Sequence, residues 1–385
     1  MVRKFGLIAV AATAVVLAIV SAAAARTTAP AAATAASCSS VQIGMTAPIT
    51  GPAGSIGSDQ LHWAQFYFTQ WNKTHKLKIK LVQFDDQIDP AKAATGAQSF
   101  ASNSKIVGVI GPAGSDQVQA AAPILKKAGL AFASGSATRV SLTSGTWKGY
   151  FFRDVPNDGV QGPTDAAYML SKLGVGSSSK VMIVDDQESY STGLADIVES
   201  SLKAKGVNVD RESVSQKATD FSSLIAKVDS STKVVFLPFQ IASEAQLFAQ
   251  QLQAQGKSAV AFGSDGTFDS SKFTVDGSYI SFFAPDVTTI PADAAIVKAF
   301  HKQFPGATSP FGAPNYVLAQ MYASAVTKAC KDGKISRAEV RKDVLKVSLP
   351  STILGGPMKL TANGDVAGAK FHIFKIENGK YVTIA

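Results

Sequence analysis

Two turns rich in Gly and Ser carry side chains that could bind a small polar molecule. They span residues 111–115 and 134–138, and each follows a short apolar run of strand length. Small residues such as Gly114 let backbone N–H groups approach a ligand, and a helix N-terminus favours an anion such as a carboxylate. Ser115 and Asp116 stand where they could cap and start such a helix. Two ordinary strand-to-helix connections would show the same composition.

An acidic turn follows another apolar run and supplies the opposite charge. Asp265 lies between Ser264 and Gly266, after residues 259–262. A carboxylate in this place can pair with a ligand cation, while hydroxyl and amide groups opposite hold an anion. The alternative is a loop Asp that caps the next helix. Tyr190 also ends a predicted strand and could form a wall of the site, with an exposed loop tyrosine as the alternative.

The elements that must position these residues alternate between strand and helix along most of the chain. Short connections between them predict an α/β protein with two doubly wound parallel-sheet lobes joined by hinge strands. After residue 285 the pattern turns helical, and strands 358–360 and 370–376 are expected around a turn at 363–365. We therefore expect the chain to cross between the lobes several times. The predicted boundaries are 41–155 plus 285–350 for lobe 1, and 156–284 plus 351–385 for lobe 2.

The first residues have the features of a secretory signal peptide. Arg3 and Lys4 precede an apolar stretch, and small residues at 21–25 offer cleavage sites. We predict a signal peptide at 1–25, a low-complexity tether at 26–40, and export to the periplasm or the extracytoplasmic cell surface.

The two cysteines, Cys38 and Cys330, are an even pair in a chain expected to be exported. Such a pair favours a single disulfide, which would link the start of the mature protein to a late helix. The alternative is that Cys38 becomes the lipidated first residue of a lipoprotein. Residues 35–37 lack the large aliphatic residue that usually stands three positions before a lipidated cysteine.

Composition and motifs argue against nucleic-acid binding and against catalysis. The net charge of +9 is spread without a run of five basic residues, so we expect no nucleic-acid partner. The four histidines lack metal-ligand spacing, and neither a nucleophile elbow nor a phosphate-binding loop is present. Gly108, Gly111 and Gly114 imitate a dinucleotide loop with the wrong spacing. We therefore predict no enzyme activity, metal or cofactor.

Several segments in order resemble the leucine/isoleucine/valine-binding proteins, which are type I periplasmic substrate-binding proteins of ABC importers. The segments are IGMTAPITGPAGSIG, DDQIDPAKA, VIGPAGS, SGSAT, VPNDGVQGPTDAAYM, VDDQESYSTGL and TDFSSLIAKV. The resemblance runs from Val41 to the C-terminal strands. It implies two doubly wound lobes, joined by three hinge strands, that close around a ligand.

The resemblance also implies roles for individual residues. Ser115 and Thr138 match the hydroxyls that hold the ligand carboxylate, and a backbone carbonyl near Ser136 would bind the ammonium together with Asp265. Tyr190 matches a second-lobe tyrosine of the site. The family usually has Glu where this chain has Asp265, whose shorter side chain changes the reach toward the ligand.

Two positions differ from the family and would shape the pocket for the ligand side chain. Ile56 and Gln240 stand where aromatic residues are usual. The resemblance therefore does not imply a branched aliphatic ligand.

The most favoured function is an exported receptor that binds an amino acid or similar zwitterion and delivers it to an ABC permease, as a monomer. Three alternatives are a ligand-sensing module of a membrane receptor, a secreted α/β hydrolase and a sugar-binding relative. The hydrolase would need a histidine beside a loop serine, and the sugar site would need aromatic residues for stacking.

Overall fold

The computed structural model describes residue 1, residues 36–307 and residues 309–385. Apart from Met1, the predicted signal peptide lies outside the described residues, as does the predicted tether up to residue 35. Among the described helices, none has the length and apolar character needed to cross a membrane.

Five parallel strands form the first sheet, in the order β3-β2-β4-β5-β6. Both faces of this sheet are buried: Ala131 and Ala133 pack into one hydrophobic core, and Phe132 packs into the core on the other face. A strand covered on both faces needs apolar residues at consecutive positions, which explains the unbroken apolar runs in the sequence. The strands are β2 Val41–Ala47, β3 Ile79–Asp85, β4 Ile106–Ile110, β5 Ala131–Ser134 and β6 Phe151–Arg153.

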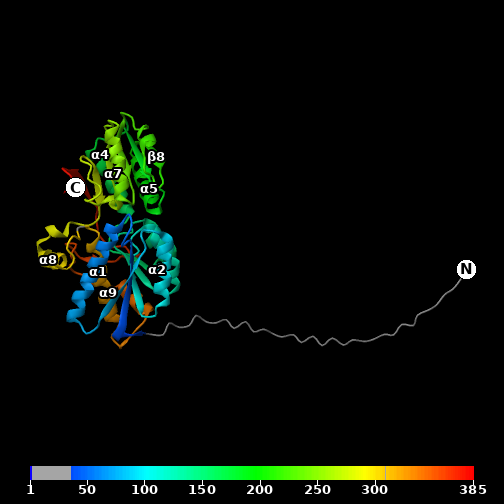
Figure 1. Ribbon diagram of the computed structural model, residues 1–385, viewed down its shortest axis with the longest axis vertical. Coiled ribbons are helices and arrows are strands. Elements are labelled where there is room, and N and C mark those ends of the chain that lie inside the picture. Colours follow the sequence, from blue (N-terminus) through cyan, green and yellow to red (C-terminus); the bar gives the residue numbers. More distant parts are fainter. Residues whose placement is uncertain (2–35, 308) are drawn as a thin grey trace. The chain divides into compact units, whose positions relative to one another are not determined.

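Helices cover both faces of the first sheet, and a glycine allows one of them to approach closely. A Cβ atom at Gly108 would collide with the ring of Tyr322. The Tyr322 hydroxyl lies 2.9 Å from the carbonyl oxygen of Val109 and 3.0 Å from that of Ala131, which ties its helix to two strands. The helices are α1 Gly54–Thr74, α2 Pro90–Ser102, α3 Ser115–Lys127, α8 Ala294–Gln303, α9 Gly312–Ala329 and α10 Arg337–Val344. Figure 1 shows α1 and α9 on one side of the strands of this sheet and α2 on the other.

The second sheet has seven strands in the order β16-β15-β11-β10-β9-β7-β8. The five strands from β11 to β8 in this order are parallel to one another. Val181 and Ile183 pack into one core and Met182 and Val184 into the other, as expected for a sheet covered on both faces. The strands are β7 Lys180–Asp185, β8 Asn208–Ser213, β9 Thr232–Leu237, β10 Val260–Gly263, β11 Tyr279–Phe282, β15 His372–Glu377 and β16 Lys380–Thr383. The helices are α4 Asp158–Lys172, α5 Ser189–Lys203, α6 Ser222–Ile225 and α7 Ala242–Ala254.

The predicted fold class is confirmed, because two α/β units with mainly parallel sheets are joined by three crossings of the chain. The crossings follow β6, β11 and the short strand β14 Met358–Lys359. Ile353, Met358 and Leu360 pack into the core of the first sheet. We therefore propose lobe 1 as 36–155 plus 285–366 and lobe 2 as 156–284 plus 367–385, with the last crossing after residue 366 instead of at 350.

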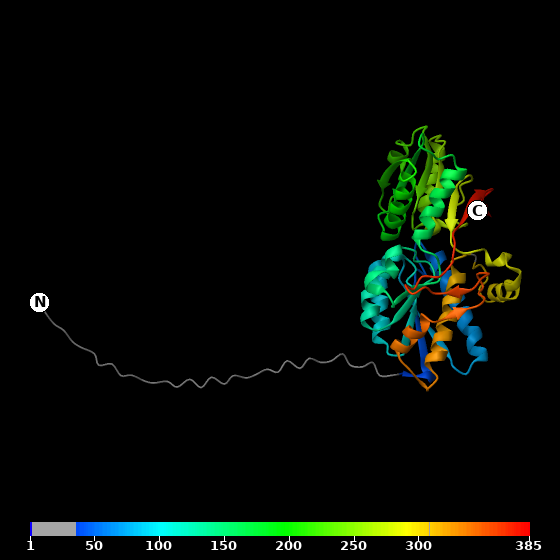
Figure 2. The same ribbon diagram turned by 180° about the vertical axis from the view of Figure 1, so that it is seen from behind.

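The C-terminal hairpin differs from the expected one. The predicted pairing of 358–360 with 370–376 is wrong: β14 pairs with β13 Ser348–Leu349, and β15 pairs with β11 and β16. The turn at 363–365 closes only the isolated bridge between Leu360 and Val366. Figure 2 shows the red C-terminal strands beside β11. Alternating residues identified a strand here, but alternation does not specify the strand's partner.

A disulfide joins Cys38 to Cys330, directly after the end of α9. The adjacent strand β1 Ala36–Ser37 pairs with β12 Lys334–Ile335, so the start of the described chain is fixed to lobe 1 twice. The sulfur of Cys38 therefore takes part in a disulfide within the chain, as predicted from the even pair of cysteines.

Candidate functional site

Loops at the carboxyl ends of strands from both sheets meet at one cavity. It is lined by Ile56, Ile88, Ala113, Ser115, Ser136, Tyr190, Gln240, Asp265 and Phe311. Six of the eight predicted ligand-binding residues are among them, and the other two, Gly114 and Thr138, lie one or two residues away in the chain. The cavity measures about 10 Å³, which is room for about one water molecule. The lobes are therefore closed around it, and a larger ligand needs them to separate.

Hydroxyl groups from two loops form the lobe 1 side of the cavity. The Ser136 hydroxyl donates to the carbonyl of Ala113 at 2.8 Å and accepts a hydrogen bond from Gln60 Nε2 at 2.8 Å. The Ser115 hydroxyl accepts from the backbone N–H of Arg139 at 3.3 Å. These bonds tie the loop after β4 to the loop after β5, so both hydroxyls have fixed positions before any ligand arrives.

Helix α3 starts at Ser115 and Asp116, as expected from the sequence, but the expected capping by these residues is wrong. Gly114 is the N-cap, and Ser115 is already the first helical residue. No side chain caps this helix, so its first N–H groups have no side-chain acceptor among the described residues. An uncapped helix start beside two hydroxyls suits a carboxylate ligand.

Asp265 forms the lobe 2 side together with Tyr190. The Tyr190 hydroxyl donates to Asp265 Oδ1 at 2.6 Å and lies 2.7 Å from Ser264 Oγ. A Cβ atom at Gly266 would collide with the carbonyl oxygen of Phe239, so glycine is needed for this turn to pack beneath the loop after β9. Burial raises the pKa of Asp265 to about 6, against the opposing effect of hydrogen bonds from Tyr190 and Gln161.

Two further buried acids, Asp158 and Asp165, stand near Asp265 and were missed from the sequence. Burial, and then the charge of Asp265, raises the pKa of Asp158 to about 7. Burial also raises the pKa of Asp165, although Ser281 donates to its Oδ2 at 3.1 Å. The spacing of Asp158, Gln161 and Asp165 places them on one face of α4, which could have revealed them. Even so, no group of His, Cys, Asp or Glu side chains in the described part of the chain is placed to hold a metal ion.

Polar contacts also join the two lobes around the cavity. Asp116 in α3 accepts hydrogen bonds from the backbone N–H of Ser189, at 2.9 and 3.0 Å, and so caps α5 of the other lobe. The Ser55 hydroxyl donates to Asp269 Oδ2 at 2.7 Å, and Lys272 Nζ donates to the carbonyl of Pro52 at 3.0 Å. These contacts exist only while the lobes are closed.

Replacing Asp116 with alanine is expected to weaken ligand binding about tenfold, because the closed arrangement loses charge-assisted hydrogen bonds. Asp89 provides a matched control: it caps α2 within lobe 1, accepting from Ala91 and Lys92. Asp89→Ala should lower the free energy of unfolding by about 1 kcal/mol and leave affinity unchanged. Calorimetric titration measures the ligand affinity of both variants, and small-angle scattering measures whether the lobes close on addition of ligand. Equal affinities of the Asp116→Ala and Asp89→Ala variants would contradict the prediction.

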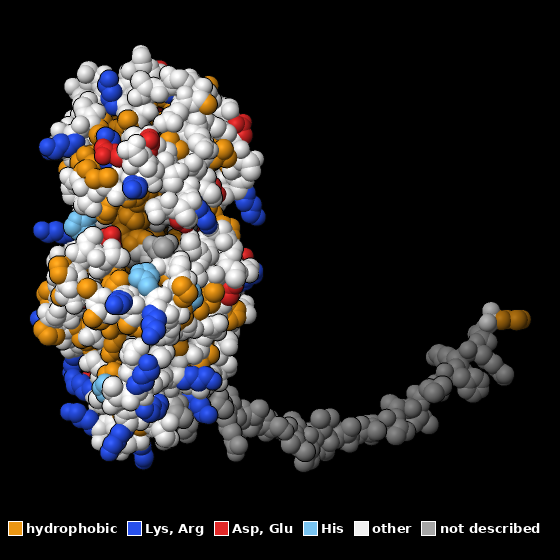
Figure 3. Space-filling view, turned by 60° about the vertical axis from the view of Figure 1, so that its left-hand side comes forward, with side chains coloured by type: hydrophobic (Ala, Val, Ile, Leu, Met, Phe, Trp, Pro, Cys, Tyr) orange, Lys and Arg blue, Asp and Glu red, His pale blue; other side chains and the backbone are white. Residues whose placement is uncertain are grey.

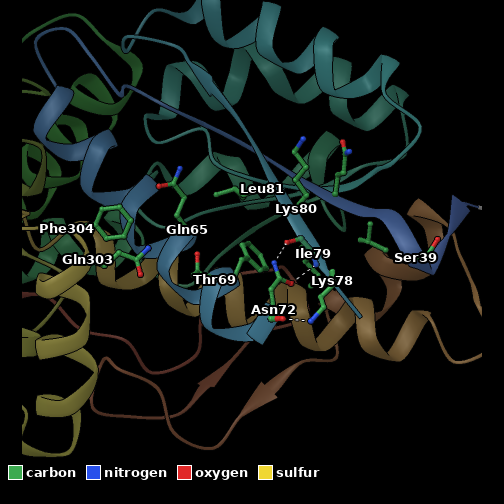
Figure 4. Close-up of a pocket in the computed structure, with 13 residues that line it drawn as sticks. Ser39, Gln65, Thr69, Asn72, Lys78, Ile79, Lys80, Leu81, Gln303 and Phe304 are labelled. Atoms are coloured by element: carbon green, nitrogen blue, oxygen red, sulfur yellow. Dashed lines mark hydrogen bonds between the residues drawn. The ribbon is translucent and has the colours of Figure 1, made fainter. Parts of the chain in front are cut away.

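A separate hollow of about 600 Å³ lies at the edge strand β3, away from the predicted site residues (Figure 4). Its best-defined feature is the side chain of Asn72. Asn72 Nδ2 donates to the carbonyl of Ile79 at 2.8 Å, and Asn72 Oδ1 accepts from the Ile79 N–H at 2.9 Å. The amide thus takes the place of a neighbouring strand at the start of β3. This is how edge strands are protected, so we assign the hollow a structural role.

Comparison with known sequences gives matches over almost the entire described chain. A sequence profile described as "Periplasmic binding protein" matches residues 40–380. The leucine-specific-binding protein of Salmonella typhimurium is 26% identical over 348 residues, which cover 88% of this chain and 92% of that protein.

Solved structures share the fold at lower sequence identity. A leucine-binding protein from Thermotoga maritima superimposes with a TM-score of 0.80 at 19% identity, covering 90% of this chain and 98% of that one. A fatty acid ABC transporter substrate-binding protein from Thermomonospora curvata also gives a TM-score of 0.80, at 18% identity, covering 90% and 91%. Proteins with different named ligands thus share this architecture.

Proposed function

Because this chain belongs to the periplasmic binding protein family, we propose that it is the solute-binding component of an ABC importer. Its ligand would be an amino acid or a similar zwitterion, bound between the lobes. It would be exported, act as a monomer and deliver the ligand to a membrane permease. The similarity to a leucine-specific-binding protein supports an amino-acid ligand.

One observation carries this proposal: the two sides of the cavity have opposite polarity. Lobe 1 offers Ser115 and the uncapped start of α3, which suit a carboxylate. Thr138 does not line the closed cavity, and its contact with the carboxylate stays a proposal from the family resemblance. Lobe 2 offers Asp265, which is 2% exposed and has Asp158 as a neighbouring acid. A zwitterion bound in a closed site needs both of its charges matched, because an unpaired buried charge is costly.

The walls of the cavity indicate the kind of ligand side chain. Ile56, Ile88 and Phe311 are apolar, whereas Gln240 contributes a side-chain amide without a hydrogen-bond partner in the described part of the structure. We propose that the ligand side chain contacts this apolar wall, with Gln240 available to a polar group on it.

A thermal-shift screen tests the proposal directly. The mature protein would be heated with each amino acid, and with anionic and uncharged analogues as controls. A ligand at about a hundred times its dissociation constant stabilises the protein by roughly 2.7 kcal/mol, which appears as a higher melting temperature. Hits confined to zwitterions support the proposal; hits confined to anions or sugars would contradict it.

Affinity for an amino acid should also depend on pH in a defined direction. Because burial raises the pKa of Asp265 to about 6, lowering the pH from about 7.5 to about 5 protonates the Asp265 carboxylate in the ligand-free protein. An ammonium pairs only with the ionised carboxylate, so affinity should fall about tenfold at the lower pH. Calorimetric titration at both values measures it, and an affinity that stays constant or rises on acidification would contradict the role of Asp265.

A further inference from the structure

A second pocket between the lobes is much larger than the cavity around Asp265. Its volume is about 760 Å³, within the range of roughly 300–1,000 Å³ found for small-molecule sites. Lobe 1 contributes residues of α1 and α8. Lobe 2 contributes Phe268 and Ser270, which follow the 3-10 helix η4 Asp265–Thr267, together with β15 and β16, and the crossing after β11 closes one side. Figure 3 shows this region as a hollow with hydrophobic side chains inside it. No residue that lines this pocket also lines the cavity around Asp265.

Aromatic rings form the apolar part of the pocket. Trp63, 3% exposed, stacks on Phe300 with ring centroids 3.7 Å apart. From the other lobe, the Phe268 ring lies 4.8 Å from that of Phe374 and 4.6 Å from that of Tyr381. All five rings line the pocket, but Phe300 is fully buried and Trp63, Phe268 and Phe374 are 3–8% exposed. The rings therefore contribute only their edges to an apolar wall, and the packing within each set fixes the position of those edges.

The polar residues of this pocket carry an excess of basic groups. Lys380, His301 and His372 line it, and within the described residues none of them forms an ion pair or a side-chain hydrogen bond. Among the described lining residues, Asp286 is the sole acid, and its Oδ1 already accepts from the Thr288 N–H at 2.9 Å and the Thr288 hydroxyl at 2.6 Å. Unmatched basic groups therefore stand beside a set of aromatic rings.

We propose that this pocket binds an amphipathic carboxylate, with its alkyl or aryl body against the apolar wall of the pocket and its carboxylate at Lys380. The imidazole N–H groups of His301 and His372 supply additional hydrogen-bond donors. Lys380 is exposed, so its ammonium is hydrated in the empty pocket and is accessible to a carboxylate at the pocket mouth. An uncharged apolar molecule would lack this charge-assisted contact, and a small carboxylate such as acetate would leave the apolar wall uncovered. This site is distinct from the proposed amino-acid site, because the two share no lining residue.

Decanoate is a suitable probe, used below its micelle-forming concentration in calorimetric titrations of the whole mature protein. We expect saturable binding of decanoate and none of acetate. Lys380→Gln should weaken decanoate binding at least tenfold. Lys375→Gln is the matched control: it lies in the same hairpin, pairs with Glu377 at 2.9 Å and does not line the pocket, so affinity should stay unchanged.

Two further variants distinguish this pocket from the cavity around Asp265. Thr383→Trp places a large ring into the pocket from an exposed strand position and should abolish decanoate binding. Asp265→Asn should leave decanoate binding intact while removing the binding of amino acids. Decanoate binding that survives Lys380→Gln and Thr383→Trp, or that is lost in Asp265→Asn, would overturn the proposal. Failure to bind decanoate in the unaltered protein would overturn it as well.

Discussion

Asp265→Asn is expected to weaken binding of an amino-acid ligand by about a hundredfold or more. The carboxyl of Asp265 is 2% exposed and held by Tyr190, so in the closed site it is the group that can neutralise a ligand ammonium. Removing one partner of a buried charge pair costs about 2–5 kcal/mol, because the remaining charge stays buried and unmatched. Calorimetric titration of the variant with the ligand found in the screen measures the loss.

The fold of the Asp265→Asn variant should be intact, which separates loss of binding from loss of structure. Asparagine keeps the shape of the side chain and can still accept from the Tyr190 hydroxyl. Because burial raises the pKa of Asp265, its ionised form is destabilising above the pKa of the unfolded chain, and this cost rises with pH. The ligand-free variant should therefore melt no lower than the unaltered protein at neutral pH. Unchanged affinity would remove Asp265 from the proposed site.

Arg153→Met is expected to lower the free energy of unfolding by about 3–5 kcal/mol. The Arg153 side chain is fully buried at the end of β6, where the chain first crosses between the lobes. Its Nε lies 2.6 Å from Asp365 Oδ1, in the segment before the last crossing. Its Nη1 donates to the carbonyls of Ala137 and Arg139, at 3.0 and 2.8 Å. Methionine would leave all three acceptors without this donor.

The same change should weaken ligand binding, because the two carbonyls that Arg153 holds flank Thr138. Arg341→Met is a suitable control, since Arg341 also lies in lobe 1 and packs over the Tyr150 ring at 4.2 Å. Losing that contact should cost about 1 kcal/mol or less. Urea unfolding of both variants compares the two, and a loss at Arg153 no larger than that at Arg341 would contradict the prediction. Arg153→Lys should rescue only part of the loss, because an ammonium cannot reach acceptors on opposite sides as the guanidinium does.

The pattern of apolar runs and turns predicts the α/β class, the two units and the placement of most candidate residues. Strands buried on both faces appear as short apolar runs, and in parallel sheets the turns after such runs come to the same edge. Ser115, Ser136 and Asp265 each follow a run of this kind, so their approach to one cavity follows from local pattern and topology. Their roles in binding a ligand stay predictions.

The remaining features of the site and of the second sheet depend on contacts between segments that are distant in the sequence, and these contacts are visible only in the folded chain. Asp116 lies in the first turn of its own helix, as expected, but its carboxylate caps α5 at Ser189, 73 residues away in the chain. The approach of Asp158 and Asp165 to Asp265 depends on how α4 packs against the second sheet, and the partner of β15 depends on the position of β11. Periodicity records which face of an element is buried, but it carries no information on which surface buries it.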